Sequence, residues 1–229
     1  MCARFSLAGP NRVVDRYPGF RLRGKGSRRY NIAPTDTVLA ARADHDIVPL
    51  RWGLVPFWAP DVAIGRRLIN ARAESLSEKP AFRHALANRR CVIFADGYYE
   101  WMHNGGTKQP YRFTVDGGAP FAFAGLWESW GRAEARVETC AIVTCAPNAL
   151  CEPFHDRMPT ILDDDALEAW LKGDVAEAVA ALVPFDATRM HAAPVTPEMN
   201  RVTFEDPRCI EPVAPEPGPT PAGGTPQSA

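Results

Sequence analysis

The sequence lacks the features that mark secreted and membrane proteins. Residues 1–20 contain no apolar run between a basic start and a small-residue cleavage site, and no stretch approaches the roughly 20 apolar residues of a membrane helix. We therefore expect a cytoplasmic protein with no membrane partner. In that compartment the six cysteines are expected to be reduced thiols rather than disulfides.

The cysteines also lack the close spacing of structural zinc motifs. Cys140, Cys145, Cys151 and His155 offer metal-ligating side chains, but no pair among them has that spacing. The sequence therefore predicts no metal site and no cofactor.

A large net charge is absent as well, because the formal value is −1, which favours no particular partner. The charges are unevenly distributed: residues 1–100 hold 17 Lys and Arg against 9 Asp and Glu, whereas residues 101–229 hold 9 against 18. This asymmetry predicts a polyanion-binding face built from the first half of the chain. The alternative is that folding intermixes the charges.

Strand patterns dominate the chain, and helical patterns are few and short. Strands are expected at residues 37–40, 47–54, 91–95, 98–101, 111–115, 121–127 and 137–144. Helices are expected at residues 79–86, 164–172 and 175–182, with a polar helical segment at 68–74 and a hairpin turn at Asp96-Gly97. The pattern predicts an α+β fold, a single domain with a curled, mainly antiparallel, barrel-like β core and a few flanking helices.

The composition changes abruptly near the C-terminus. Residues 213–229 are rich in Pro and Gly and contain no aromatic residue. Such a segment cannot bury enough apolar surface to fold. We therefore expect a folded domain over residues 2–212 and a disordered tail over residues 213–229.

Removal of Met1 would make Cys2 the N-terminal residue. Cys2 would then offer an α-amine and a thiol two carbons apart, a 1,2-aminothiol that condenses with aldehydes. The amine forms a Schiff base, and the thiol can add to the same carbon to close a thiazolidine ring. Taken alone, a cysteine at position 2 is better explained as an accident, so the case depends on the rest of the chain.

Four motifs follow one another along the chain. They are Met1-Cys2-Ala3-Arg4 and residues 69–74, 96–101 and 154–159, with residues 30–34 and 51–54 between the first two. In this order they resemble the SOS-response-associated peptidase (SRAP) family of abasic-site processing proteins, over roughly residues 2–212. The resemblance implies a SRAP-like fold.

The resemblance also implies a function. A SRAP domain would sense abasic sites in single-stranded DNA and form a covalent crosslink through its N-terminal cysteine, shielding the lesion during the DNA damage response. Lyase activity and autoproteolytic removal of Met1 would accompany it. The expected protein is a monomer that associates with the nucleoid when bound to DNA, with replication-associated proteins as further candidate partners.

The match assigns roles to individual residues. It places the nucleophile at Cys2, the group that orients the sugar and the α-amine at Asn70, the acid/base group at Glu100 and a histidine beside the Schiff base at His155. The residues that would bind DNA are three phosphate-contacting arginines and a base-stacking wall: Arg4, Arg72, Arg157, Pro34 and Trp58. Two residues depart from the family pattern, since Ala3 stands where glycine is usual and Thr203 where lysine is more common.

The chemistry of an abasic sugar independently explains why Glu100 and His155 would be needed. An abasic sugar is mostly a closed hemiacetal, so opening it requires proton delivery to the ring oxygen. Glu100 lies among Tyr98, Tyr99 and Trp101, an apolar setting that would raise the pKa of its carboxyl group and suit it to this task. His155 has an imidazole that titrates near neutrality and can shuttle protons. Taken alone, Glu100 would more often be a surface carboxylate and His155 a salt-bridged loop residue.

Two other functions remain open from the sequence. The first is a thiol hydrolase in which Cys2 and His155 form a nucleophile and base pair acting on other proteins. The second is a non-catalytic single-stranded DNA-binding module, in which arginines neutralise phosphates and aromatic rings stack on bases. Cleavage of an added peptide would favour the first, and binding that is unaffected by a blocked N-terminus would favour the second.

Overall fold

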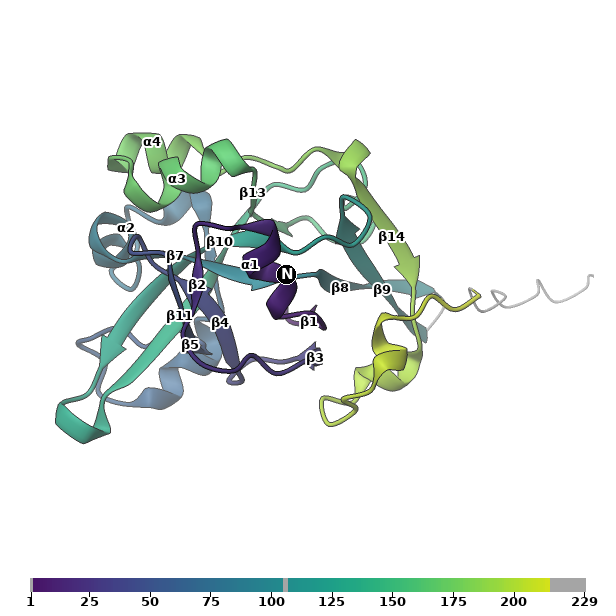
Figure 1. Cartoon of the computed structure of the whole chain (residues 1–229), viewed down its shortest axis with the longest axis horizontal. Coiled ribbons are helices and arrows are strands. Elements are labelled where there is room, and N and C mark those ends of the chain that lie inside the picture. The colour runs from purple at the N-terminus through teal and green to yellow at the C-terminus, as the bar shows by residue number, and fades with distance from the viewer. Residues whose placement is uncertain (1, 105–106, 215–229) are drawn as a thin grey trace, which may run out of the picture.

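The computed structural model describes residues 2–104 and 107–214. A closed five-stranded barrel forms one part of the fold, with its strands in the order β11, β10, β7, β4 and β5 (Figure 1). The ring closes because β5 pairs in parallel with β11, and the other four pairings are antiparallel. The barrel strands are β4 (Thr37–Ala41), β5 (Asp46–Trp52), β7 (Arg90–Ala95), β10 (Phe121–Trp130) and β11 (Val137–Cys145).

A second sheet of five strands carries the N-terminal strand. Its order is β14, β9, β8, β1 and β3, and β1 lies between β8 and β3, antiparallel to both. The strands are β1 (Phe5–Leu7), β3 (Arg29–Ile32), β8 (Gly97–Asn104), β9 (Thr107–Val115) and β14 (Met190–Pro194). The residues that precede β1, including Cys2, therefore lie beside β8.

Short elements complete the described part of the chain. Four short strands extend the barrel sheet: β2 (Arg21–Leu22), β6 (Asn70–Arg72), β12 (Met158–Pro159) and β13 (Ile161–Leu162). The α-helices are α1 (Asn11–Arg16), α2 (Arg83–Asn88), α3 (Asp164–Lys172) and α4 (Val175–Ala180). The 3-10 helices are η1 (Val62–Arg67), η2 (Ala73–Ser75), η3 (Ala133–Ala135), η4 (Ala187–Arg189), η5 (Pro197–Asn200) and η6 (Pro207–Ile210).

An aromatic cluster joins β1 to the barrel. The fully buried ring of Phe5 packs edge-on against Trp52 and Phe123, with centroids 5.1 and 5.8 Å away. Burial of such a side chain contributes about 1.5–3 kcal/mol. The indole nitrogen of Trp52 donates to the carbonyl of Ile69 at 2.8 Å, so the same ring also fixes the chain just before β6. This cluster holds the segments that carry Cys2 and Asn70 in one core.

The predicted fold class is confirmed, and most predicted elements are present. The helix expected at 175–182 ends earlier, at Ala180, and the helix expected at 79–86 begins later, at Arg83. The polar helical segment predicted at 68–74 is wrong, because Asn70–Arg72 is strand β6, parallel to β11. The backbone carbonyl of Ile69 is engaged by Trp52 and by the amide of Ile142, so long-range pairing overrides the local preference.

The hairpin predicted at Asp96-Gly97 is also wrong. Strand β7 pairs with β4 and β10 in the barrel, whereas β8 pairs with β1 and β9 in the other sheet. Asp96 and Gly97 thus lie where the chain passes from one sheet to the other. A Cβ at Gly97 would lie 2.5 Å from the guanidinium of Arg112, so this glycine allows a close approach rather than a turn.

The carboxylate of Asp96 ties the two sheets together at this crossing. It accepts hydrogen bonds from the Ser6 hydroxyl at 2.7 Å and from the Ala8 amide at 2.6 Å, and it pairs with Arg112 at 2.9 Å. The Asp96 side chain is buried. The strand that follows Cys2 is therefore anchored by a buried carboxylate.

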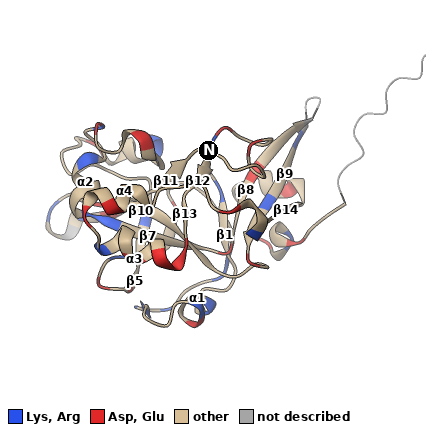
Figure 2. Cartoon of the chain, turned by 90° about the horizontal axis from the view of Figure 1, so that it is seen from above, with Lys and Arg blue, Asp and Glu red and all other residues tan. Residues whose placement is uncertain are grey.

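Folding intermixes the charges that the sequence separates. Basic and acidic residues are interspersed over both parts of the fold (Figure 2). Four arginines of the first hundred residues pair with carboxylates of the remainder, in the pairs Arg16–Asp164, Arg29–Glu205, Arg42–Glu138 and Arg89–Glu128. These pairs reduce the positive field that the asymmetry predicted for the first half.

The residues around the predicted domain boundary at residue 212 contact β14. Pro212 forms an isolated bridge with Val195, and the Val213 amide donates to the Pro194 carbonyl at 2.9 Å. Val213, which we assigned to the tail, is therefore tied to β14. Residues 215–229 of the predicted tail lie outside the described residues. None of the described helices is long and apolar enough to cross a membrane.

The Asp96 network makes a prediction about stability. Asp96→Ala should lower the free energy of unfolding by about 3–5 kcal/mol, because it leaves the Arg112 charge buried without its partner. Asp15→Ala, which removes an exposed carboxylate on α1, should change it by less than about 0.5 kcal/mol. Urea unfolding measures both, and equal small effects would show that the network does not anchor β1.

Candidate active site

Cys2 is fully buried beside β8. Its thiol lies 3.7 Å from the Arg4 carbonyl, and the Tyr99 amide donates to that same carbonyl at 3.0 Å. Burial raises the pKa of the Cys2 thiol, and the charge of nearby Glu100 raises it further. The sulfur is therefore protonated at neutral pH and is a weak nucleophile in this state.

Asn70 fixes the backbone of Cys2. Its side-chain amide donates to the Cys2 carbonyl at 2.8 Å. The other amide atom, Oδ1, is buried and has no hydrogen-bond partner among the described residues. A buried acceptor without a partner is costly, so it marks a place where a donor is expected.

Glu100 lies on β8 and is 6% exposed. Burial raises the pKa of its carboxyl group, since removal from water disfavours the charged form. The hydrogen bond from the Tyr99 amide to the Arg4 carbonyl places the segment of Cys2 beside that of Glu100. A buried carboxyl group with a raised pKa is suited to donate a proton and take it back.

His155 follows the turn that leads into β12. Its Nδ1 accepts a hydrogen bond from the Arg157 amide at 3.0 Å, so the neutral ring carries its proton on Nε2. Burial lowers the pKa of His155, which favours this neutral form. The carboxylate of Asp156 lies 2.7 Å from the same Nδ1 and can bond to it only when that nitrogen is protonated.

Buried groups lie beneath these residues. The Tyr98 hydroxyl is 3.0 Å from the Cys151 sulfur, and both side chains are electrostatically coupled to Glu100. Burial raises the pKa of Cys151 to about 11. The sequence does not bring Tyr98 and Cys151 together, because they are 53 positions apart and meet only in the folded chain.

The three arginines that the resemblance marked as phosphate contacts differ in their environments. Arg72 is exposed at the end of β6. Arg157 forms a two-bond pair with Glu74, at 2.7 and 2.8 Å. Arg4 is 9% exposed and donates to the Asn31 side chain and to the carbonyls of Met199 and Asn200.

Of the three, Arg72 is the one whose guanidinium forms no hydrogen bond or ion pair with another described residue. Arg4 ties the N-terminal segment to η5, and Arg157 joins Glu74 to the end of β11. The phosphate contacts of all three stay predictions.

The predicted stacking residues lie on loops. Trp58 is 50% exposed, Pro34 is half-buried, and the neighbouring Phe57 is also exposed. The Trp58 loop is held where the Trp130 indole donates to the Ala59 carbonyl at 2.7 Å. Exposed aromatic rings on a tethered loop are available for stacking, which stays a prediction for Pro34 and Trp58.

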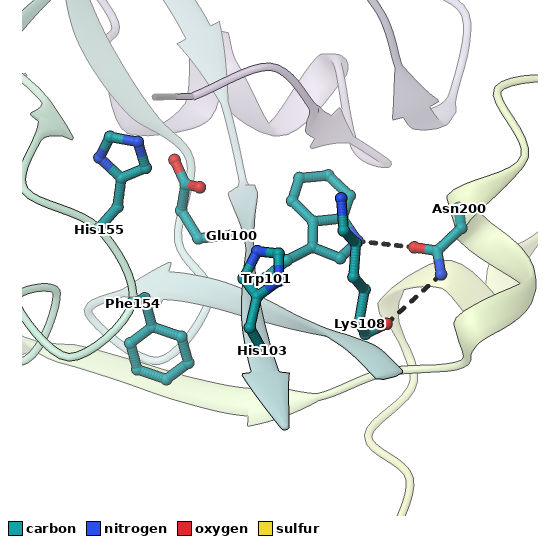
Figure 3. A pocket seen from close by; sticks show the side chains of 7 residues that line it. All are labelled: Glu100, Trp101, His103, Lys108, Phe154, His155 and Asn200. Atoms are coloured by element: carbon teal, nitrogen blue, oxygen red, sulfur yellow. Dashed lines mark hydrogen bonds between the residues drawn. The ribbon is translucent and has the colours of Figure 1, made fainter. Parts of the chain in front are cut away.

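A cavity of about 370 Å³ adjoins the site (Figure 3). Glu100 and His155 line it together with residues that the motifs did not mark as functional: Trp101, His103, Lys108, Phe154 and Asn200. Within the described ranges, no group of three or more His, Cys, Asp and Glu side chains is arranged to hold a metal ion.

The sequence of this chain matches a known class of protein. The SOS response associated peptidase (SRAP) family model matches residues 1–202, and the chain belongs to this family.

Among its relatives is the abasic site processing protein YoqW of Bacillus subtilis, which is 40% identical over 222 residues, 92% of this chain and 99% of YoqW. The mouse abasic site processing protein HMCES is 31% identical, over 93% of this chain and 76% of HMCES.

Solved structures share the fold. A Bacteroides thetaiotaomicron protein superposes with a TM-score of 0.85 at 27% identity, covering 93% of this chain and all of that one. A Bordetella bronchiseptica protein gives a TM-score of 0.75 at 26% identity, covering 85% of this chain and all of that one. The similarity therefore extends over nearly the whole described chain.

The contacts of His155 Nδ1 with Arg157 and Asp156 lead to a prediction about the pKa of His155. Asp156→Asn should lower the pKa of His155, because it removes a negative charge that favours the imidazolium. Asp156 is exposed, so the interaction is worth less than about 1 kcal/mol and the shift should be below one pKa unit. Titration of the imidazole resonances by NMR measures it, with Asp15→Asn as the control. An unchanged pKa would show that Asp156 does not stabilise the charged ring.

Proposed function

We propose that this protein processes abasic sites in single-stranded DNA and forms a covalent crosslink to them through Cys2 after loss of Met1. The observation that carries the proposal is the position of Cys2: Asn70 holds its carbonyl at 2.8 Å, and the buried carboxyl group of Glu100 lies beside it. The names of YoqW and HMCES as abasic site processing proteins support the same substrate.

The reaction begins with the closed sugar. Glu100 donates a proton to the ring oxygen as the bond between this oxygen and the anomeric carbon breaks, and the carboxylate so formed takes the proton of the anomeric hydroxyl. The product is an open aldehyde, and Glu100 is restored. The raised pKa of Glu100 keeps the donating form present at higher pH than for an ordinary glutamate.

The amine of Cys2 then attacks the aldehyde carbon. Asn70 Oδ1, the buried acceptor without a described partner, would receive a hydrogen bond from this amine and direct its lone pair. The carbinolamine loses water to give the imine, and His155 transfers the protons of this step. Addition of the thiol to the imine carbon, with its proton passing to nitrogen, closes the thiazolidine, so one water leaves overall.

Burial of Cys2 separates this proposal from the thiol hydrolase. A hydrolase requires a thiolate as its first nucleophile, which the raised pKa of Cys2 disfavours. In the crosslinking route the amine attacks first, and the thiol is needed only in the last step, against an already activated carbon. The remaining alternative, a DNA-binding module without catalysis, predicts no covalent product.

The first test removes the sulfur and keeps the amine. Cys2→Ser with a free N-terminus should form a Schiff base that borohydride traps, but no lasting crosslink. The wild-type adduct on an abasic oligonucleotide should have the summed mass less one water, and peptide mapping should locate it on residue 2. Protein with a blocked N-terminus is the control. An undiminished adduct with that control, or an adduct on another cysteine, would contradict the mechanism.

The second test removes the proton donor. Glu100→Gln should slow crosslinking to a closed abasic sugar by about 100-fold or more and slow it less on an aldehyde that needs no ring opening. In the wild type, ring opening should fall as pH rises through the raised pKa of Glu100, and the Gln variant should lose this dependence. Glu78→Gln, which alters an exposed carboxylate, is the matched control.

A measurement of unfolding stability distinguishes slower crosslinking by Glu100→Gln from unfolding of this variant. The pKa of Glu100 is higher in the folded than in the unfolded protein, so any stability that Glu100 contributes is present at low pH and lost as pH rises through the folded value. Glu100→Gln should therefore be at least as stable as the wild type at neutral pH. Equal slowing on both substrates, with lowered stability, would indicate structural damage.

A further inference from the structure

The turn between β11 and β12 carries His155 and is folded around Asn148. The Asn148 side chain accepts hydrogen bonds from the amides of Leu150 and Cys151, at 3.1 and 3.0 Å. The Cys151 carbonyl in turn accepts the amides of Phe154 and His155, at 2.9 and 3.1 Å. The position of the His155 backbone therefore depends on that of Cys151.

The side chain of Cys151 connects this turn to β8. Its sulfur lies 3.0 Å from the Tyr98 hydroxyl, and either group can donate the hydrogen bond. Tyr98 is fully buried and Cys151 is 3% exposed, so bulk water has little access to this contact. The proposed reaction gives neither side chain a role, although the contact is only one backbone hydrogen bond away from His155.

Aromatic packing fixes the ring of Tyr98. This ring stacks on Phe113, with centroids 4.9 Å apart and an angle of 15° between the planes. Phe154, the residue before His155, packs edge-on against Phe113 and Tyr111, with centroids 5.0 and 4.9 Å away. Aromatic pairs of this kind contribute about 0.5–1.5 kcal/mol each beyond the area they bury. The Tyr98 hydroxyl is thus held by a ring with a fixed orientation.

Tyr98 and Glu100 lie two residues apart on β8, so their side chains are on the same face of the strand. In the strand register they are opposite Phe113 and Tyr111, the two rings on which the turn packs. Glu100 and His155 line the same cavity (Figure 3). One strand therefore carries both the proposed acid and the hydroxyl that contacts the His155 turn.

We propose that Tyr98 is a positioning residue whose hydroxyl acts through Cys151 to hold His155 in place relative to Glu100. The contact fixes the backbone from which the imidazole extends, and it takes no part in the transfer of protons. This role rests on the proposed function, in which His155 transfers the protons of imine formation. Loss of the contact should therefore impair the step that follows ring opening.

The test begins with Tyr98→Phe, which removes one oxygen and keeps the stacked ring. Borohydride trapping measures Schiff-base formation on an aldehyde that needs no ring opening, and this step should slow by about 10-fold, because a small misplacement of a catalytic group lowers the rate. In a His155→Ala background, Tyr98→Phe should cause no further slowing. A bond that only stabilises the fold would give the same factor in both backgrounds.

Two changes at Cys151 test the route through this residue. Cys151→Ser keeps a group that can bond to the Tyr98 hydroxyl and should retain most of the rate. Cys151→Ala removes that group and should slow Schiff-base formation as much as Tyr98→Phe does. The double variant with Tyr98→Phe should lose no more than either single variant, because both changes break the same contact.

Tyr99→Phe is the matched control. Tyr99 is also buried, lies on the same strand and donates its hydroxyl to the Tyr30 carbonyl at 2.7 Å, but it points to the other face of β8. This variant should form the Schiff base at the wild-type rate. An equal loss with Tyr99→Phe, an unchanged rate with Tyr98→Phe, an undiminished factor in the His155→Ala background, or equal losses with Cys151→Ser and Cys151→Ala would overturn the proposal.

Hydrogen exchange of the His155 amide separates this proposal from the reaction. The amide donates to the Cys151 carbonyl, so it should exchange several-fold faster in Tyr98→Phe and at the wild-type rate in Tyr99→Phe. A wild type that forms no adduct with an abasic site, yet shows this pattern, would refute the crosslinking reaction and leave Tyr98 as the group that positions His155. An adduct formed without this pattern would keep the reaction and overturn the positioning role.

Discussion

The position of Cys2 depends on the carboxylate of Asp96. This group lies where the chain leaves the barrel for the second sheet, and it binds Ser6, Ala8 and Arg112 at the same point. A single buried charge thereby fixes the N-terminal strand against both sheets. A residue that precedes such an anchored strand is positioned more precisely than one on a free loop, and Cys2 is such a residue.

Burial gives the site its chemical character. The thiol of Cys2, the carboxyl group of Glu100 and the imidazole of His155 all have pKa values displaced towards their neutral forms. In such a buried setting each charge interacts strongly with its neighbours, because little water is present to screen it. Exposed basic side chains lie outside this group, at Arg72 and Lys108.

The sequence predicted the family, the fold class and most strands, because motifs and apolar alternation are local signals. It failed where distant contacts decide the structure. Asp96-Gly97 resembles a turn, yet Arg112 and Ser6 make it a crossing between sheets. Asn70 resembles part of a helical segment until its pairing with β11 is known.

The same limit applied to the site. The four residues of the predicted centre carry motif signals and could be marked in advance. Arg4 donates hydrogen bonds to the carbonyls of Met199 and Asn200, almost 200 positions away, so no local sequence pattern predicts these contacts. His103 and Lys108 face each other only through the register of β8 and β9, which no spacing in the sequence specifies.

The buried position of Cys2 has a consequence for how the protein is made. A chain emerges from the ribosome amino end first, but the groups that enclose Cys2 come later: Asn70 from β6, Glu100 from β8, and the carbonyls of Met199 and Asn200 that hold Arg4. The barrel behind them cannot close before β11 has been synthesised. The surroundings of Cys2 are therefore complete only after the segment near residue 200 has been synthesised.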